Sequence, residues 1–315
     1  MNSLFIALTL SVSSIFGTFN LNDIYPEVRI TVEAPEYLDP AKPTELIFFA
    51  LPNGNDIDWT AGKKLEEGDD WHYNIQHISA QTEFLRVNDV KKNYVTVYLK
   101  DQKRSWTSWR YRHADILPET LEAIISDVSA LYKDYNPCVT LSSHSGGGYF
   151  IFEYIRTAEP INPLIHRIVF LDSVYGYLEE VHCAKFTEWL KDKSHYLCVI
   201  SYEDSTVIYD GKMLVSKEGG TWGRSHAMVR DLSKSFNVRL YTDGLWEIYR
   251  ACGKRVTFKL LKNPEGKIWH TVLVARNGFI DSCLAGTRLE GRKYDFWGEA
   301  AYSQYIPANS LGSGN

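Results

Sequence analysis

Strand-like and helix-like hydrophobic patterns alternate along most of the chain. Continuous apolar runs bounded by turn residues predict buried strands. These runs lie at residues 28–34, 45–52, 138–143, 166–173, 196–203 and 255–262, and residues 94–100 alternate as a strand does. Apolar residues that recur every three or four positions predict helices at 71–86, 116–135, 148–158 and 183–193. Strands that alternate with helices are typical of a parallel sheet that helices cover on both faces.

The pattern therefore predicts an α/β fold with one mostly parallel central sheet and helices on both faces. A turn-rich LDPAKPT stretch separates 28–34 from 45–52, so we expect these two strands to form an antiparallel pair. Residues 205–254 are rich in Gly, Trp and Ser, and we expect helix and loop there that cover one end of the sheet. No linker divides the chain, so residues 18–315 are expected to form one domain.

The first 17 residues, MNSLFIALTLSVSSIFG, have an apolar core of signal-peptide length. That core is shorter than the ~20 residues that a membrane-spanning helix needs. No Lys or Arg precedes it and no A-x-A pattern ends it, so an N-terminal element packed on the domain is the alternative. We expect residues 1–17 to be a signal peptide and the mature protein to be secreted or periplasmic, or cytoplasmic on the alternative. The mature protein is expected to have no membrane span.

Charge and composition restrict the partners and cofactors. The 315 residues carry a formal net charge of −5 with interspersed signs, so there is no basic footprint for nucleic acid. The five cysteines contain no C-x-x-C pair, and their odd number prevents complete internal pairing. No ordered cluster of His and carboxylate residues stands out, so we expect neither a metal nor another cofactor.

A turn of small residues stands where strand 138–143 becomes helix 148–158. It reads Ser143-His144-Ser145-Gly146-Gly147, a variant of the G-x-S-x-G nucleophile elbow in which Ser143 replaces the first glycine. The serine at the apex needs a strained backbone, and its neighbours must be small enough for the helix and strands to approach. A phosphate-binding turn is the alternative, but the G-x-G-x-x-G spacing and the P-loop lysine are both missing.

From about residue 28 to residue 290, the chain resembles the α/β-hydrolase superfamily, specifically its serine esterase and lipase-like members. The family's catalytic residues come in the order Ser, acid, His. The resemblance implies Ser145 as nucleophile, Asp204 as acid and His270 as base, since both follow strands in the expected order. Asp172, after an earlier strand, is the alternative acid, and His226 is the alternative base.

The resemblance also implies an oxyanion hole made of two backbone N–H groups. Gly146 follows the nucleophile and supplies one of them. The second comes from the loop after strand 45–52, where Asn53, Gly54 and Asn55 are the candidates. An Asn-Gly turn without function is the alternative for this loop.

Aromatic and basic residues fall in segments expected near the active-site end of the sheet. They are Trp106, Trp109, Arg110, Trp222 and Trp269. Flat apolar faces of this kind suit sugars or aromatic acyl groups, and arginine suits a carboxylate or phosphate. The alternative is that these tryptophans close loops over the core.

Together these features predict a serine hydrolase that cleaves a small-molecule or glycan ester, such as an ester of a carbohydrate or another polar metabolite, without a cofactor. An amidase, peptidase or acyltransferase would use the same triad. A catalytically silent hydrolase fold that acts as a binding protein is the alternative from a different functional class. The sequence does not indicate the oligomeric state.

Overall fold

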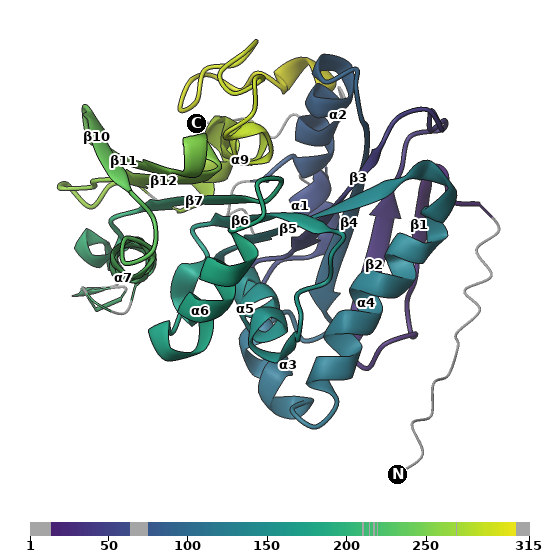
Figure 1. Ribbon diagram of the computed structural model, residues 1–315, viewed down its shortest axis with the longest axis horizontal. Coiled ribbons are helices and arrows are strands. Elements are labelled where there is room, and N and C mark those ends of the chain that lie inside the picture. Colours follow the sequence, from purple (N-terminus) through teal and green to yellow (C-terminus); the bar gives the residue numbers. More distant parts are fainter. Residues whose placement is uncertain are drawn as a thin grey trace.

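The computed structural model describes residues 14–63, 75–209, 211–213, 215–216, 218, 220–268 and 270–306. A ten-stranded mixed sheet runs through the protein in the order β1-β2-β4-β3-β5-β6-β7-β12-β11-β10 (Figure 1). Its strands are β1 (Thr18–Asn20), β2 (Val28–Glu33), β3 (Thr44–Ala50), β4 (Asn93–Asp101), β5 (Pro137–His144), β6 (Ile165–Leu171), β7 (Tyr196–Tyr202), β10 (Arg239–Asp243), β11 (Trp246–Ala251) and β12 (Val256–Leu261). Strands β4, β3, β5, β6, β7 and β12 are parallel to their neighbours within this group.

Helices cover both faces of the sheet, as the hydrophobic pattern predicts. Figure 1 shows α3 (Trp106–Arg112), α4 (Leu117–Leu131), α5 (Gly148–Thr157), α6 (Glu179–Trp189) and α7 (Thr221–Leu232) on one side. It shows α2 (Ile78–Asn88) and α9 (Phe279–Leu284) on the other. The described elements also include α1 (Ile57–Ala61), α8 (His270–Leu273) and a separate small hairpin of β8 (Ile208–Tyr209) and β9 (Lys212–Met213). The predicted α/β fold class is confirmed.

Strand β3 shows how this layering follows from the sequence. All of its residues are buried, because helices cover both faces of the sheet at this point. Leu46, Phe48 and Ala50 belong to the core beneath α3–α7, whereas Ile47 and Phe49 belong to the core beneath α2 and α9. Burial of each large apolar side chain contributes roughly 1.5–3 kcal/mol, so a strand without polar alternation is stable only between two layers.

The expected antiparallel pair of strands 28–34 and 45–52 is wrong. β4 lies between β2 and β3, antiparallel to β2 and parallel to β3. β3 is buried throughout and therefore suits the middle of the sheet, with a parallel partner on each side. β2 alternates between buried and more exposed positions, which suits a strand near the edge.

The helix predicted at 71–86 begins later than expected. α2 starts at Ile78, because His77 has a φ of +50° and cannot belong to a right-handed helix. Residues 71–74 lie outside the described part of the chain.

Residues 205–254 do more than cover one end of the sheet, and this expectation is also corrected. The segment contains α7, but it then forms the hairpin β10–β11, which extends the sheet beyond β12. Gly244 opens the two-residue turn with a φ of +56°. The Asp243-Gly244 dipeptide is a typical hairpin signal, so the sequence does contain a sign of this feature.

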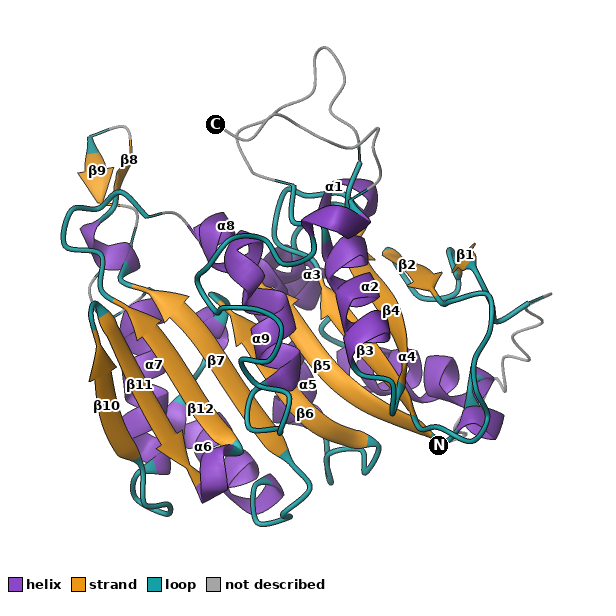
Figure 2. Ribbon diagram, turned by 90° about the horizontal axis from the view of Figure 1, so that it is seen from above, coloured by secondary structure: helices purple, strands orange, loops and turns teal. Residues whose placement is uncertain are grey.

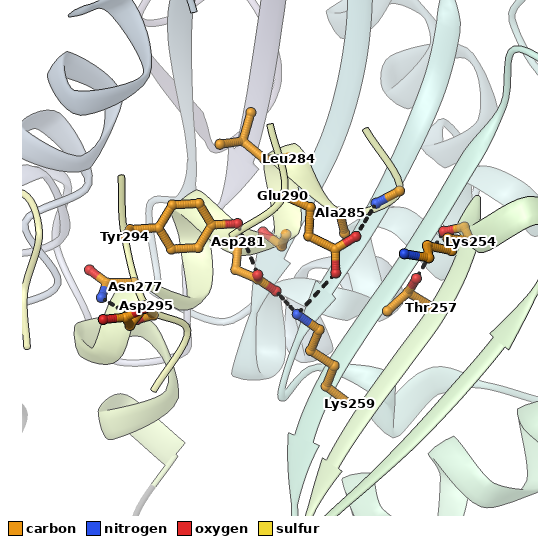
Figure 3. Close-up of polar contacts among 12 residues, drawn as sticks. Lys254, Thr257, Lys259, Asn277, Asp281, Leu284, Ala285, Glu290, Tyr294 and Asp295 are labelled. Carbon is orange, nitrogen blue, oxygen red and sulfur yellow. Dashed lines mark hydrogen bonds and ion pairs between the residues drawn. The ribbon is translucent and has the colours of Figure 1, made fainter. Parts of the chain in front are cut away.

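A buried ion-pair network fixes the segment after α8 against β12 (Figure 3). Lys259 Nζ lies 2.6 Å from Asp281 Oδ2 and 3.5 Å from Glu290 Oε1. The Tyr294 hydroxyl donates to the other oxygen of Asp281 at 3.0 Å. Burial raises the pKa of Asp281, and the neighbouring ammonium of Lys259 opposes that effect. Removing one partner of such a pair would leave an uncompensated buried charge, so the network links the chain's C-terminal part to the sheet.

The N-terminal prediction is only partly within the described residues, which begin at residue 14. The carbonyl of Ile15 accepts a hydrogen bond from the Tyr132 hydroxyl at 3.0 Å, and the Phe16 and Tyr135 rings meet edge to face. Among the described helices, none has the length and apolar character that a bilayer crossing requires. All five cysteines are free thiols.

Candidate active site

Ser145 lies at the apex of a sharp strand-to-helix turn. β5 ends at His144 and α5 begins at Gly148, so only a single 3₁₀ turn, Ser145–Gly147, joins them. Ser145 has a φ of +52°, which is uncommon for a residue with a side chain and costs conformational energy. This is the strand–turn–helix context that a nucleophile elbow requires. Because the parallel strands point to the same edge, the turn lies at the carboxyl end of the sheet.

The glycines after Ser145 are required by close backbone packing. A Cβ atom on Gly147 would lie 2.1 Å from the carbonyl oxygen of Ala50, at the end of β3. A Cβ atom on Gly148 would lie 1.8 Å from the carbonyl oxygen of Ser173, in the loop after β6. Both contacts are far shorter than atoms allow, so any larger residue would push the turn away from the neighbouring strands.

Ser143, the departure from the usual G-x-S-x-G pattern, has a structural partner. Its buried hydroxyl lies 2.8 Å from the hydroxyl of Ser173. Ser173 also donates to the carbonyl of Ser143 at 3.3 Å. These bonds fasten the loop after β6 to the end of β5, next to the point where that loop touches Gly148.

The loop after β3 packs directly on the residue that follows Ser145. A Cβ atom on Gly146 would meet the side-chain amide of Asn53 at 2.3 Å. The N–H of Gly54 donates to the carbonyl of Arg104 at 2.9 Å, and the N–H of Asn55 donates within its own turn at 3.5 Å. Among the described residues, the backbone N–H of Asn53 has no such partner. Of the three predicted donors in this loop, Asn53 therefore has the available N–H group beside Gly146.

Both candidate acids are fully buried, and they lie side by side. Asp172 follows β6 with a φ of +45°, and Asp204 follows β7. The Thr221 hydroxyl stands between the two carboxylates: it donates to Asp172 Oδ1 and lies 3.3 Å from Asp204 Oδ2. The backbone N–H of Thr221, at the start of α7, also donates to Asp204 at 2.7 Å.

The proximity of two buried carboxylates has an electrostatic consequence. Burial, together with the negative charge of Asp172, raises the pKa of Asp204 to about 7. Hydrogen bonds from backbone N–H groups at the start of α7 oppose this effect. A proton bound by one member of the pair would reduce the repulsion between Asp204 and Asp172.

The predicted base, His270, is the first residue of α8, and its side chain lies outside the described residues, as does Trp269. Leu273 of α8 packs in the same core as Leu171 at the end of β6 and Ile200 in β7. Figure 2 shows α8 at the end of the sheet toward which the parallel strands point. The backbone of His270 thus belongs to the same edge of the sheet as the elbow and the two aspartates.

The alternative base, His226, is engaged elsewhere, and this alternative is corrected. Its Nε2 lies 2.9 Å from the carboxylate of Glu247 on β11, and its Nδ1 lies 3.0 Å from the carbonyl of Trp222. Both ring nitrogens are occupied, so neither is available to accept a proton from a serine. His144, next to the nucleophile, is buried, and its Nδ1 lies 2.7 Å from Gln76 Nε2.

The expectation that Trp106 and Trp109 face a substrate is wrong for this structure. They are 2% and 1% exposed, and both belong to the core beneath the sheet. α3 lies against α5, where the Trp106 ring meets that of Phe150 edge to face at 5.0 Å. Arg110 is paired with Glu153 at 2.9 Å. These residues attach α3 to the domain.

Of the predicted aromatic residues that the structure describes, Trp222 has its backbone beside Asp204. Its backbone N–H is 3.4 Å from Asp204 Oδ1, and its half-buried ring contacts that of His226 at 4.5 Å. Together with Arg224 and Arg230, it lines a surface cavity of about 450 Å³.

Glu45, Cys138 and His166 form, within the described residues, a group whose ligand atoms are spaced closely enough for a metal ion. They stand near the amino ends of β3, β5 and β6, opposite the edge that carries Ser145. The Glu45 carboxylate already contacts Lys92 at 2.5 Å and His166 at 2.7 Å. We interpret Glu45 as a carboxylate whose charge is neutralised by Lys92 and His166.

Two residues of the site were not predicted from the sequence. Ser173 joins the loop after β6 to β5, and Thr221 joins the two aspartates. Neither belongs to a motif. Ser173 does follow Asp172 at the end of a predicted strand, which is the one sequence sign that it reaches this edge of the sheet.

Comparisons with known proteins find similarity only at the level of three-dimensional structure. No family model matches the chain, and no curated protein matches it. A feruloyl esterase module from Clostridium thermocellum is 9% identical over 88% of this chain and 89% of its own, with a TM-score of 0.47. A poly(3-hydroxybutyrate) depolymerase from Bordetella parapertussis is 10% identical over 84% and 89%, also with a TM-score of 0.47. A thermostable esterase is 17% identical over 79% of this chain but only 55% of its own, with a TM-score of 0.44. The architecture itself is a mixed, mostly parallel ten-stranded sheet with helices on both faces.

Proposed function

We propose that this protein is a serine hydrolase that cleaves a carboxylic ester through an acyl-enzyme. The observation that carries the proposal is the elbow: Ser145 is held at a φ of +52° between β5 and α5 by glycines that the packing requires. A strained side-chain-bearing residue persists only where its surroundings enforce it, and such positions cluster at active sites.

In the proposed reaction, Ser145 Oγ attacks the carbonyl carbon of the ester while His270 takes its proton. The tetrahedral intermediate places negative charge on the former carbonyl oxygen, and the N–H groups of Gly146 and Asn53 stabilise that charge. Collapse of the intermediate expels the alcohol, which receives the proton from His270. Water then attacks the acyl-enzyme with His270 as base again, releasing the acid and restoring Ser145.

We propose Asp204 as the residue that orients His270, with Asp172 as the alternative. Asp204 follows the second strand after β5 in the parallel sheet, the position that the family's order favours. Its carboxylate is held by N–H groups of α7, so it is pre-oriented by the fold. Asp172 touches the same threonine, so the two assignments differ in which carboxylate contacts the imidazole.

The proposed substrate is an ester of a carbohydrate or another polar metabolite. With Trp106 and Trp109 in the core, support for this class comes from Trp222, Arg224 and Arg230, which line one surface cavity. A planar apolar face with nearby guanidinium groups suits a ring that carries polar or anionic substituents. Amide cleavage or transfer of the acyl group to an alcohol would use the same residues.

Kinetic assays with activated esters test this proposal. Ser145→Ala should lower kcat by at least ~10³-fold, because removal of one triad member disables the unit. Asp204→Asn should lower kcat strongly while Asp172→Asn has a much smaller effect, and the reverse result would assign the acid to Asp172. If the folded wild type shows no turnover that depends on Ser145, the catalytically silent binding protein becomes the better proposal.

Export is a separate proposal, supported by the apolar residues 1–17. Cleavage after Gly17 would remove the contacts of Ile15 and Phe16 with the domain. Mass spectrometry of the protein recovered from expressing cells distinguishes the outcomes. An N-terminus at residue 18 in the periplasm or medium supports export, and an intact Met1 in the cytoplasm contradicts it.

A further inference from the structure

The five-residue hairpin strand β10 forms an exposed edge of the central sheet. It is the last strand in the sheet order, and all of its residues, Arg239–Asp243, are exposed. Leu240 and Tyr241 are 50% and 52% exposed. Natural proteins usually protect such edges with lysine, proline, bulges or short strands, because an open edge pairs with other strands. β10 has no lysine, proline or bulge and carries charges only at its two ends, whereas the opposite edge strand, β1, has only three residues.

The hairpin geometry indicates which backbone groups of β10 face outward. Asp243 and Trp246 flank a two-residue turn, so they form a hydrogen-bonded pair of the ladder. Hydrogen-bonded and non-hydrogen-bonded pairs alternate along an antiparallel ladder. Tyr241 and Arg239 therefore bond to β11, and the N–H and C=O groups of Leu240 and Thr242 point away from it. The outer edge offers two donors and two acceptors.

β10 carries a basic residue at one end and an acidic residue at the other, so two antiparallel copies can pair their charges. Arg239 stands at one end of the strand and Asp243 at the other, with their side chains on the same face as Tyr241. Within the described part of the chain, neither residue belongs to an ion pair or a side-chain hydrogen bond, unlike Arg250 on the adjacent strand, which pairs with Glu290 at 2.5 Å.

We propose that β10 is a homodimer interface in which two copies of the chain join their sheets edge to edge. A twofold axis that passes between the two Tyr241 residues pairs the strands antiparallel. Leu240 then forms a hydrogen-bonded pair with Thr242 of the partner subunit, which uses all the outward backbone groups. The same register sets Arg239 opposite Asp243 of the partner subunit, twice in each dimer.

The end charges select this register and this partner. Shifting the partner strand by two residues in either direction leaves at least one Arg239 and one Asp243 without an opposite charge. An unrelated strand would have to supply an acidic and a basic residue at the same spacing. A second copy of the chain supplies them by symmetry. The interface does not involve Ser145 or the aspartate pair, so this inference stands independently of the proposed hydrolase activity.

Sedimentation analysis of the purified protein over a wide concentration range tests the interface. The wild type is expected to form a reversible dimer. Arg239→Asp and Asp243→Arg should each weaken dimerisation by about tenfold or more, because each turns both attractive cross-strand pairs into repulsive ones. The double variant Arg239→Asp/Asp243→Arg should recover most of the wild-type affinity, since the charges are exchanged but remain complementary.

A backbone variant separates edge pairing from a dimer formed elsewhere. Thr242→Pro removes an N–H group that points away from β11, so the hairpin and the circular dichroism spectrum should be retained. The dimer should be lost. A wild type that is monomeric at every concentration would overturn the proposal, and so would a dimer that persists in Thr242→Pro or a double variant as weak as the single ones.

Discussion

Replacement of Gly147 by alanine tests whether the turn after Ser145 packs too closely on β3 to accept a side chain. Gly147 has φ −59° and ψ −22°, a backbone conformation that alanine adopts readily. Any loss of stability must therefore come from the added methyl group and not from the backbone. That methyl would lie 2.1 Å from the carbonyl oxygen of Ala50 and 2.7 Å from its carbonyl carbon.

The size of the effect follows from these distances. Atoms of this kind do not approach within 3.0 Å, so the turn and β3 must separate by at least 0.9 Å. β3 is held between β4 and β5 and cannot yield easily. Forcing an extra carbon into such packing costs roughly 1–3 kcal/mol, and alanine's better helix propensity returns at most about 1 kcal/mol. We expect Gly147→Ala to lower the free energy of unfolding by about 2 kcal/mol.

The matched control is Gly146→Ala, one residue earlier in the same turn. The three atoms nearest to its methyl group would all belong to the side chain of Asn53, which is exposed and can rotate away. Its stability should therefore remain within about 1 kcal/mol of wild type. Movement of Asn53 would disturb the proposed oxyanion donor, so ester hydrolysis should fall by about 10²-fold.

Urea unfolding followed by circular dichroism measures the stability of both variants. The packing argument is refuted if Gly147→Ala unfolds within 0.5 kcal/mol of wild type, a threshold of about the usual size of surface effects. It is also refuted if Gly146→Ala is destabilised as strongly as Gly147→Ala, because the two methyl groups meet different kinds of obstacle.

Two further predictions concern buried charges. Asp204, with its pKa raised to about 7, keeps a proton in the folded state that the unfolded state has released, so stability should fall as the pH rises from about 4 to about 7. Asp172→Asn should reduce this pH-dependent loss of stability by about 1.4 kcal/mol for each unit by which the pKa of Asp204 decreases. Asparagine tolerates the φ of +45° at this position, so the backbone should not be disturbed. Lys259→Met should cost about 3–5 kcal/mol at neutral pH, because it leaves Asp281 buried without its counter-ion, and less as the pH falls, because protonation of Asp281 removes the unpaired charge.

Unfolding measured at a series of pH values checks both. A pH dependence that is unchanged in Asp172→Asn would contradict the proposed repulsion between the two carboxylates. For the second network, Lys259→Met/Asp281→Asn is the control, since it removes both charges and should recover part of the lost stability. Equal destabilisation of the single and double variants would mean that lost packing, and not the unpaired carboxylate, causes the effect.

The sequence predicts the central strands well because their burial leaves a direct mark. Strands such as β3 and β6 contain continuous apolar runs, Leu46–Ala50 and Ile168–Leu171, since both of their faces are covered. The order of strands is not local information, and the pairing of β2 with β4 depends on contacts between distant segments. β10 was missed for the opposite reason: a strand exposed on both faces carries no apolar run, and only the Asp243-Gly244 turn marks it.

For the candidate site, the local motif was predictable and the tertiary contacts were not. The SHSGGG turn could be predicted from its residues, because a left-handed apex and close packing demand small side chains. The orientation of a tryptophan cannot be read from its position in the chain, so Trp109 was expected at a substrate cleft and lies in the core. Thr221 joins Asp172 and Asp204 from a helix that is distant in sequence, a contact that only the fold creates.

Labelling with a fluorophosphonate probe tests the central claim most directly, because the probe reacts with activated serine nucleophiles and needs no knowledge of the substrate. The purified wild type, Ser145→Ala and the exposed-surface control Ser235→Ala are compared, and the modified peptide is identified by mass spectrometry. The account predicts one label on Ser145 in the wild type and in Ser235→Ala, and none in Ser145→Ala. A folded wild type that stays unlabelled, or a label on a different serine, would contradict it.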